Sequence, residues 1–125
     1  MKFKTMMVIK AVVCLGFGVL ILIVPDFVYG MFGMDLTDAA RVPARQYGAS
    51  LIGVLLITWF GRNMVEVLSK RVVALGLTFY DALGFVVALV AVLGGVMNAL
   101  GWSIVVLYLL LAIGFGYFWL NPSKP

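Results

Sequence analysis

Apolar residues occur along this chain in four long runs, and the short segments between the runs hold most of the charged residues. The run at residues 72–97 contains a single formally charged residue, Asp81. A helix of about 20 apolar residues is long enough to cross the hydrocarbon core of a bilayer. The pattern therefore predicts an all-α integral membrane protein, a four-helix bundle in one domain over residues 1–125. Its spans are expected at about 6–24, 45–62, 72–97 and 102–120.

Helix-breaking and polar residues set the expected ends of these spans. Pro25 cannot continue a helix interior and should end the first span. Residues 25–44 mix aspartates with aromatic side chains, so they are expected to lie at the outer interface, with a short capped helical turn. The second helix could continue along the surface toward Leu68. The short turn at residues 98–101 predicts a tight antiparallel hairpin of the third and fourth helices.

Composition supports a membrane protein and excludes several functions. The chain is 65% hydrophobic and 11% charged, whereas soluble domains average roughly 45–50% and 25%. The net charge of +4 comes from residues at helix ends rather than from a patch, so no nucleic-acid partner is expected. There is no histidine. The commonest metal ligand and general base is therefore missing, and neither a metal nor a cofactor is expected.

Lysine and arginine residues are distributed unequally between the two sides of the predicted spans. With the N-terminus in the cytoplasm, the outer segments carry Arg41 and Arg45, and the inner side carries seven basic residues: Lys2, Lys4, Lys10, Arg62, Lys70, Arg71 and Lys124. Cytoplasmic loops retain an excess of such residues. Both chain ends are therefore expected in the cytoplasm. Trp102 should then lie at the outer interface and Trp119 at the inner one.

Asp81 is the main candidate for a functional residue. At ~1.5 Å per residue from Val72 it lies roughly 13 Å deep, where a charged side chain costs on the order of 2.5–3.5 kcal/mol. It shares one helix face with Thr78, Gly84 and Ala88, so it should point into the protein. It is either protonated or paired, because burial disfavours an isolated carboxylate. Its candidate partners are Lys10, Tyr47, Tyr80, Tyr108 and Arg45.

Three roles for Asp81 remain open: a structural polar contact, a ligand or proton site, and a contact to another protein. Lys10 could extend its ammonium group back to the lipid head groups or reach toward Asp81. Tyr108 could donate a hydrogen bond to the carboxyl group. On each of these interpretations, Asp81→Asn is expected to preserve insertion and folding.

Small residues four apart suggest close helix packing, because small side chains let helix backbones approach in lipid. The pairs are Ala49/Gly53, Gly84/Ala88, Ala91/Gly95 and Ala112/Gly116. They predict either packing inside the bundle or a dimer face, and the aromatic residues around Gly116 could instead leave a groove for a lipid. Arg41 and Arg45 begin the second span. They are expected to anchor it, pairing with Asp35 or Asp38, or to bind a lipid phosphate.

Two stretches resemble a known group of proteins. Residues 44–63 contain an arginine, a Tyr-Gly-Ala helix start, an internal glycine and a closing Arg-Asn, and residues 98–118 run from Asn-Ala-Leu-Gly-Trp to Gly-Tyr-Phe. Both are similar to small four-helix bacterial membrane proteins that are grouped as DoxX-like or left uncharacterised. The resemblance implies a multi-pass protein of the bacterial cytoplasmic (inner) membrane. The chain has no Cys-x-x-Cys motif, so a thiol redox role suggested for some relatives is not expected.

These features predict a non-enzymatic membrane protein, an accessory or assembly subunit of a larger membrane complex. The alternative is a small dimeric proton-coupled transporter, or a binder of a lipid or small molecule, that uses Asp81. An enzyme is not expected, because Asp81 has no catalytic set around it in the sequence, although a lipid-modifying role stays open. The expected partners are the lipid bilayer and another membrane protein or a second copy of the chain.

Overall fold

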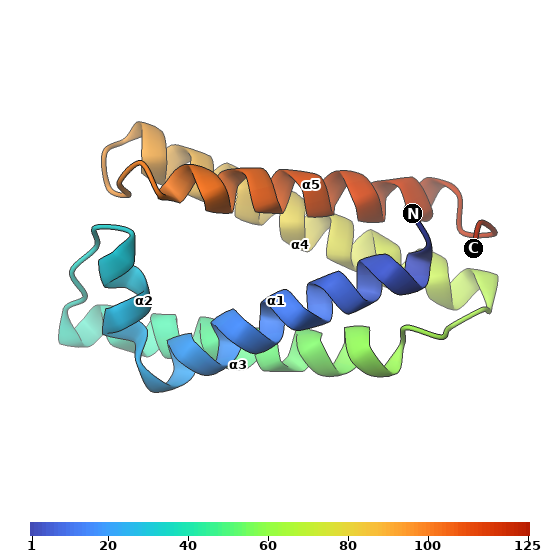
Figure 1. Ribbon diagram of the computed structural model, residues 1–125, viewed down its shortest axis with the longest axis horizontal. Coiled ribbons are helices and arrows are strands. Elements are labelled where there is room, and N and C mark those ends of the chain that lie inside the picture. Colours follow the sequence, from blue (N-terminus) through green and yellow to red (C-terminus); the bar gives the residue numbers. More distant parts are fainter.

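The computed structural model describes residues 1–125 as five α-helices joined by short loops (Figure 1). They are α1 (Phe3–Ile23), α2 (Pro25–Met31), α3 (Asp38–Phe60), α4 (Val67–Leu93) and α5 (Gly101–Leu120). The prediction of an all-α protein is confirmed. The prediction of a hairpin of the last two long helices is also confirmed, because α4 and α5 pack along their length.

The long helices form two pairs, α1 with α3 and α4 with α5. The pairs meet near the chain termini and diverge toward the end that carries α2 (Figure 1). Where they meet, a buried apolar cluster from α1, α4 and α5 holds them together, and Phe3 lies edge-to-face on Phe118 with ring centroids 5.5 Å apart. At the diverging end the two pairs are bridged instead by hydrogen bonds, because Asn98, in the turn after α4, donates to the carbonyl oxygens of Phe32 at 2.9 Å and Met31 at 3.0 Å.

The α1–α3 pair depends on two glycines. A Cβ atom at Gly48 would lie 2.9 Å from the backbone nitrogen of Leu22 and 3.1 Å from the carbonyl oxygen of Gly18. A Cβ atom at Gly18 would lie 3.0 Å from the side chain of Ile52. The two helix backbones therefore pack closely, and at Gly48 a side chain would collide with the backbone of α1.

The glycines singled out in the sequence differ in what they contact. At Gly84 a Cβ atom would lie 2.5 Å from the ring of Tyr108, so this ring packs directly against the backbone of α4. Gly116 lies in ordinary contact range of Thr78. Gly53, by contrast, has no atom within 4 Å of its Cβ position. The expectation that it packs inside the bundle is therefore wrong. Gly95 lies beyond the last residue of α4, in a turn with φ +77° that glycine adopts without strain.

The helix ends differ from the predicted ends for identifiable local reasons. Pro25 does end α1, but it also begins α2, because a proline at the first helical position loses no helical hydrogen bond. The second long helix begins at Asp38, where Thr37 Oγ1 accepts a hydrogen bond from Ala40 N at 3.1 Å. It ends at Phe60, so the expected continuation to Leu68 is wrong.

The start of α4 is capped by a carboxylate. Glu66 directly precedes α4 and accepts hydrogen bonds from Leu68 N at 3.1 Å and from Ser69 N at 2.8 Å. Leu68 therefore lies in the first turn of α4, not at the end of α3. The Ser69 hydroxyl also donates to Glu66. These bonds hold the pKa of Glu66 below its usual value. At the other end α4 stops at Leu93 rather than Met97, since Gly94 and Gly95 turn the chain toward α5.

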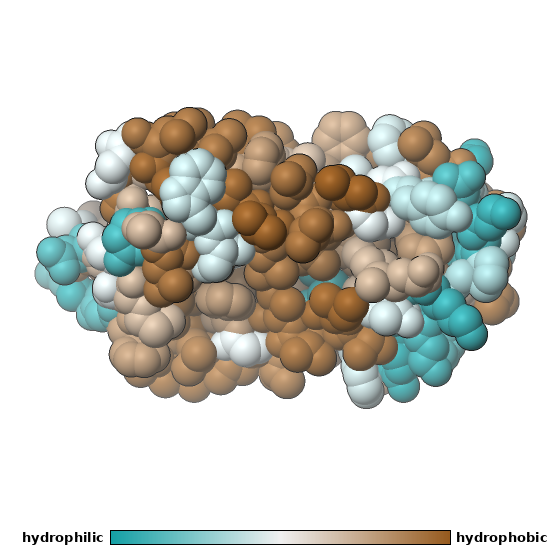
Figure 2. Space-filling view, turned by 45° about the horizontal axis from the view of Figure 1, so that its top comes forward, coloured by the Kyte–Doolittle hydropathy of each residue, from teal (hydrophilic) through white to brown (hydrophobic).

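Helices α1, α4 and α5 are each long and apolar enough to cross a membrane, which indicates a multi-pass membrane protein. On the face shown in Figure 2, apolar residues form a belt across the middle of the molecule, and hydrophilic residues lie at both ends. Helix α3 is less apolar than the other three because its first two turns contain Asp38, Arg41 and Arg45.

Candidate functional site

A cavity of about 620 Å³ lies between the two helix pairs, where they diverge. This volume is within the range of roughly 300–1,000 Å³ that is typical of small-molecule sites. All five helices contribute to its walls. The walls are apolar apart from one lysine and four tyrosine hydroxyls, and their main apolar residues are Phe17, Ile21, Val28, Phe32, Leu51 and Leu111.

Lys10 and Asp81 form a buried ion pair across the two helix pairs. Lys10, on α1, donates a hydrogen bond from its ammonium group to Asp81 Oδ1 on α4. The two side chains are 2% and 0% exposed. Of the five candidate partners of Asp81, Lys10 is the one that bonds to it, whereas Arg45 is exposed on α3. The expectation that Lys10 extends to the lipid head groups is wrong, because its ammonium group is buried against Asp81.

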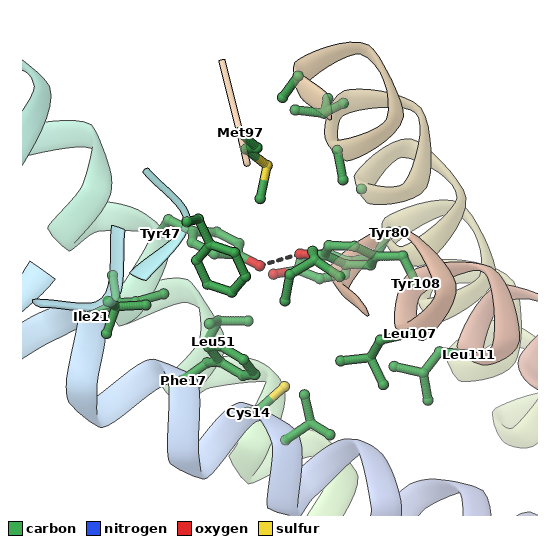
Figure 3. A pocket seen from close by; sticks show the side chains of 18 of the residues that line it. Cys14, Phe17, Ile21, Tyr47, Leu51, Tyr80, Met97, Leu107, Tyr108 and Leu111 are labelled. Atoms are coloured by element: carbon green, nitrogen blue, oxygen red, sulfur yellow. Dashed lines mark hydrogen bonds between the residues drawn. The ribbon is translucent and has the colours of Figure 1, made fainter. Parts of the chain in front are cut away.

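A second polar bridge joins the pairs. The hydroxyl groups of Tyr47 on α3 and Tyr108 on α5 are hydrogen-bonded to each other, so Tyr108 is not bonded to Asp81 as the sequence suggested. In Figure 3 the rings of Tyr47 and Tyr108 reach toward each other from opposite walls, and Tyr80 lies beside Tyr108. The Lys10 ammonium lies 4.7 Å from the ring centroid of Tyr80 and 5.8 Å from that of Tyr108. These distances are in the range of cation–π interactions.

Two buried polar atoms have no hydrogen-bond partner in the protein, the hydroxyl oxygen of Tyr80 and Oδ2 of Asp81. The great majority of buried polar side-chain atoms are hydrogen-bonded, and an unpaired one is costly. Tyr80 also lines the cavity. The polar end of the site therefore has hydrogen-bonding capacity that its own side chains do not use.

The basic residues of α3 lie away from this site. Arg41 forms ion pairs with Asp26, at 3.1 Å from its Nε, and with Asp38. Asp38 was one of its expected partners, whereas Asp26 lies on α2 and was not expected; Asp35 forms no ion pair with it. The ion pair of Arg41 with Asp26 ties α2 to the start of α3. Arg45 forms no ion pair.

The two tryptophans proposed as interface anchors lie near opposite ends of α5. Trp102 is the second residue of this helix and is 45% exposed. Trp119 is next to the last residue, and its ring lies edge-to-face with Phe79 at a centroid distance of 6.0 Å. Because α5 runs along most of the long axis of the molecule (Figure 1), the two tryptophans are far apart along that axis.

Cys14 is a residue of the site that the sequence interpretation left out. It is fully buried, it lines the cavity, and it lies one helical turn beyond Lys10 on α1. Phe17 and Ile21 follow on the same face at steps of three and four. The regular spacing of this face from Lys10 onward is the signal that could have placed Cys14 in the site.

No family model matches the chain, and no curated protein or solved structure matches it either. The resemblance to DoxX-like proteins stays an expectation. The functional argument therefore rests on the geometry of the cavity and its polar groups.

Proposed function

We propose that this chain is a non-enzymatic membrane protein that binds a lipophilic small molecule in the cavity between its two helix pairs. The observation that carries the proposal is the cavity itself, which combines apolar walls with a small group of polar side chains. This combination is typical of ligand sites, in which apolar walls hold the ligand and a few polar groups orient it. Lys10 belongs to this polar group, and its partner Asp81 is buried behind the cavity wall.

The ligand is expected to enter from the bilayer. Leu83 and Val87 on α4 line the cavity, yet they are 63% and 69% exposed. Both lie in the central part of an apolar helix that is long enough to span a membrane. The mouth of the cavity beside them therefore faces lipid in the proposed arrangement, so a molecule dissolved in the bilayer could enter without crossing water.

The proposed topology has four spans, with α3 as the fourth. Helix α3 lies against α1 at Gly18 and Gly48, so a bilayer crossed by α1 is also crossed by α3. Basic residues gather at the end with the chain termini: Lys2, Lys4, Arg62, Lys70, Arg71 and Lys124. The opposite end holds Asp26, Asp35 and Asp38 with two basic residues, Arg41 and Arg45. This asymmetry supports termini in the cytoplasm, and the proposed location is the bacterial inner membrane.

Cysteine labelling tests this topology. In a Cys14→Ala background, Asp35→Cys should react with a membrane-impermeant maleimide in intact cells, because residue 35 lies at the proposed outer end. Lys124→Cys should react only after the cells are opened. Labelling of Lys124→Cys in intact cells, with Asp35→Cys protected, would reverse the topology, and labelling of both would contradict four spans.

Native mass spectrometry of the protein extracted from its own membranes tests the proposed function. The expected result is one small molecule bound per chain. Ala91→Phe should remove this molecule, because Ala91 lines the cavity and the added ring fills it. Val90→Phe is the matched control, since Val90 is 65% exposed and is not part of the cavity wall.

Other outcomes of this measurement would contradict the proposal. An empty chain, or a bound molecule that both variants retain equally, would exclude ligand binding in this cavity. A defined larger assembly without a bound molecule would instead support the accessory-subunit prediction. A homodimer that holds the molecule would support the proposed binding and add the dimer expected of a carrier.

A further inference from the structure

We infer that the cavity selects a molecule whose hydrocarbon body carries an uncharged hydroxyl head group, and that the hydroxyl of Tyr80 binds this head group. The inference rests on the proposed function and names the class of ligand. Its starting point is that the apolar walls cannot select a ligand by themselves. Moving a hydrocarbon chain from lipid to an apolar wall gains nothing from the hydrophobic effect, because lipid tails are equally apolar. Selection must therefore come from the polar groups.

The polar groups of the cavity carry no net charge. The single positive charge of Lys10 is paired with the single negative charge of Asp81. Tyr47 and Tyr108 are hydrogen-bonded to each other, which occupies one hydroxyl donor. A carboxylate or phosphate head group would have to compete with Asp81 for Lys10 and would lie close to a like charge. A cationic head group would meet the corresponding repulsion from Lys10.

The depth of the site also disfavours a charged head group. Tyr80 and Asp81 lie at the middle of α4, which runs from Val67 to Leu93. Charged groups are expensive at the centre of a bilayer. A head group that reaches Tyr80 must leave the interface, and an uncharged head group does so at a lower cost.

The unpaired atoms match a hydroxyl group. Tyr80 offers a hydroxyl that can donate one hydrogen bond and accept others, and Asp81 Oδ2 can only accept. The Lys10 ammonium, which can donate three bonds, makes one. An alcohol in the cavity can accept from Tyr80 or Lys10, which both line it, or can donate its own proton to the Tyr80 oxygen. A pure hydrocarbon would leave these groups unpaired, which is the arrangement that buried sites reject most strongly.

A series of probes with the same tail tests this inference. The probes are 1-hexadecanol, palmitate at pH 8 and hexadecane, and the measurement is equilibrium binding of each labelled probe to the full chain in nanodiscs. Hexadecanol should bind about tenfold more tightly than either of the others. Tyr80→Phe should weaken hexadecanol binding roughly two- to tenfold, the effect of one lost hydrogen bond, and should leave hexadecane binding unchanged. Tyr117→Phe is the control, because Tyr117 is exposed and outside the cavity.

The outcomes separate this inference from the proposed function. Palmitate binding as tight as that of hexadecanol, or hexadecanol binding unaffected by Tyr80→Phe, would overturn the inference. Equal binding of all three probes, blocked by Ala91→Phe, would also overturn it and would leave the proposed function standing. Failure of every probe to bind would overturn both.

Discussion

Asp81→Asn is expected to lower the free energy of unfolding by about 3–5 kcal/mol, because removing one partner of a buried ion pair leaves the other charge uncompensated. Lys10 is 2% exposed, and Asp81 Oδ1 is its recorded hydrogen-bond acceptor. The ion pair revises the expectation, formed from the sequence alone, that this substitution preserves folding. Reversible unfolding in mixed detergent, followed by circular dichroism, measures the change.

A double-mutant cycle isolates the contribution of the pair. Lys10→Met should be destabilising for the same reason as Asp81→Asn, since it leaves a buried carboxylate. The double variant Lys10→Met/Asp81→Leu should recover most of the lost stability, because an apolar pair of similar volume replaces an ion pair at little cost. If each single substitution leaves stability within about 0.5 kcal/mol of the original chain, the two groups do not form a buried ion pair.

Gly48→Ala is expected to destabilise the protein by about 1–3 kcal/mol, because the added methyl group overpacks the contact of α3 with α1. Its Cβ atom would lie 2.9 Å from a backbone atom of Leu22, which cannot move without shifting α1. Gly53→Ala is the matched control on the same helix. It has open space at the Cβ position, so the lower conformational entropy of alanine should stabilise the helix by about 0.5–1 kcal/mol.

The measurement is the same unfolding experiment, and the comparison of the two variants removes the effect of helix propensity, which is common to both. A loss of stability at Gly48 with no loss at Gly53 would support the pairing of α1 with α3. Equal changes at both positions would contradict the close contact at Gly18 and Gly48. Loss at Gly53 alone would indicate that the outward face of α3 contacts another chain.

Much of the fold could be predicted from the sequence, because helix length and turn chemistry are local properties. The apolar runs predicted α1, α4 and α5. The short turn after α4 predicted the hairpin of α4 with α5. Lys10 was among the expected partners of Asp81, since the depths of both residues follow from residue counts along their helices. A capped helical turn was expected within residues 25–44, and the cap found there, Thr37, begins α3 itself.

The pairing of α1 with α3 could not be predicted in the same way. Lipid-facing and protein-facing side chains are equally apolar in a membrane protein, so hydropathy does not show which helix faces meet. Glycine spacing was ambiguous for the same reason: Gly48 holds a helix contact, whereas Gly53 faces outward. The cavity depends on the divergence of the two pairs, which is a property of the whole bundle. The hydrogen bond between Tyr47 and Tyr108 also depends on how the two helix pairs are arranged, because it joins α3 to α5.

Photo-crosslinking from inside the cavity tests most directly whether it holds a ligand. Phe17 lines the cavity, and Phe79 is 53% exposed on α4, so benzoylphenylalanine can replace either one with a modest change in shape. After irradiation in native membranes, mass spectrometry identifies the adducts. We expect one defined small molecule on the Phe17 variant and a mixture of bulk lipids on the Phe79 variant. The same lipid mixture on both variants would contradict a selective binding cavity.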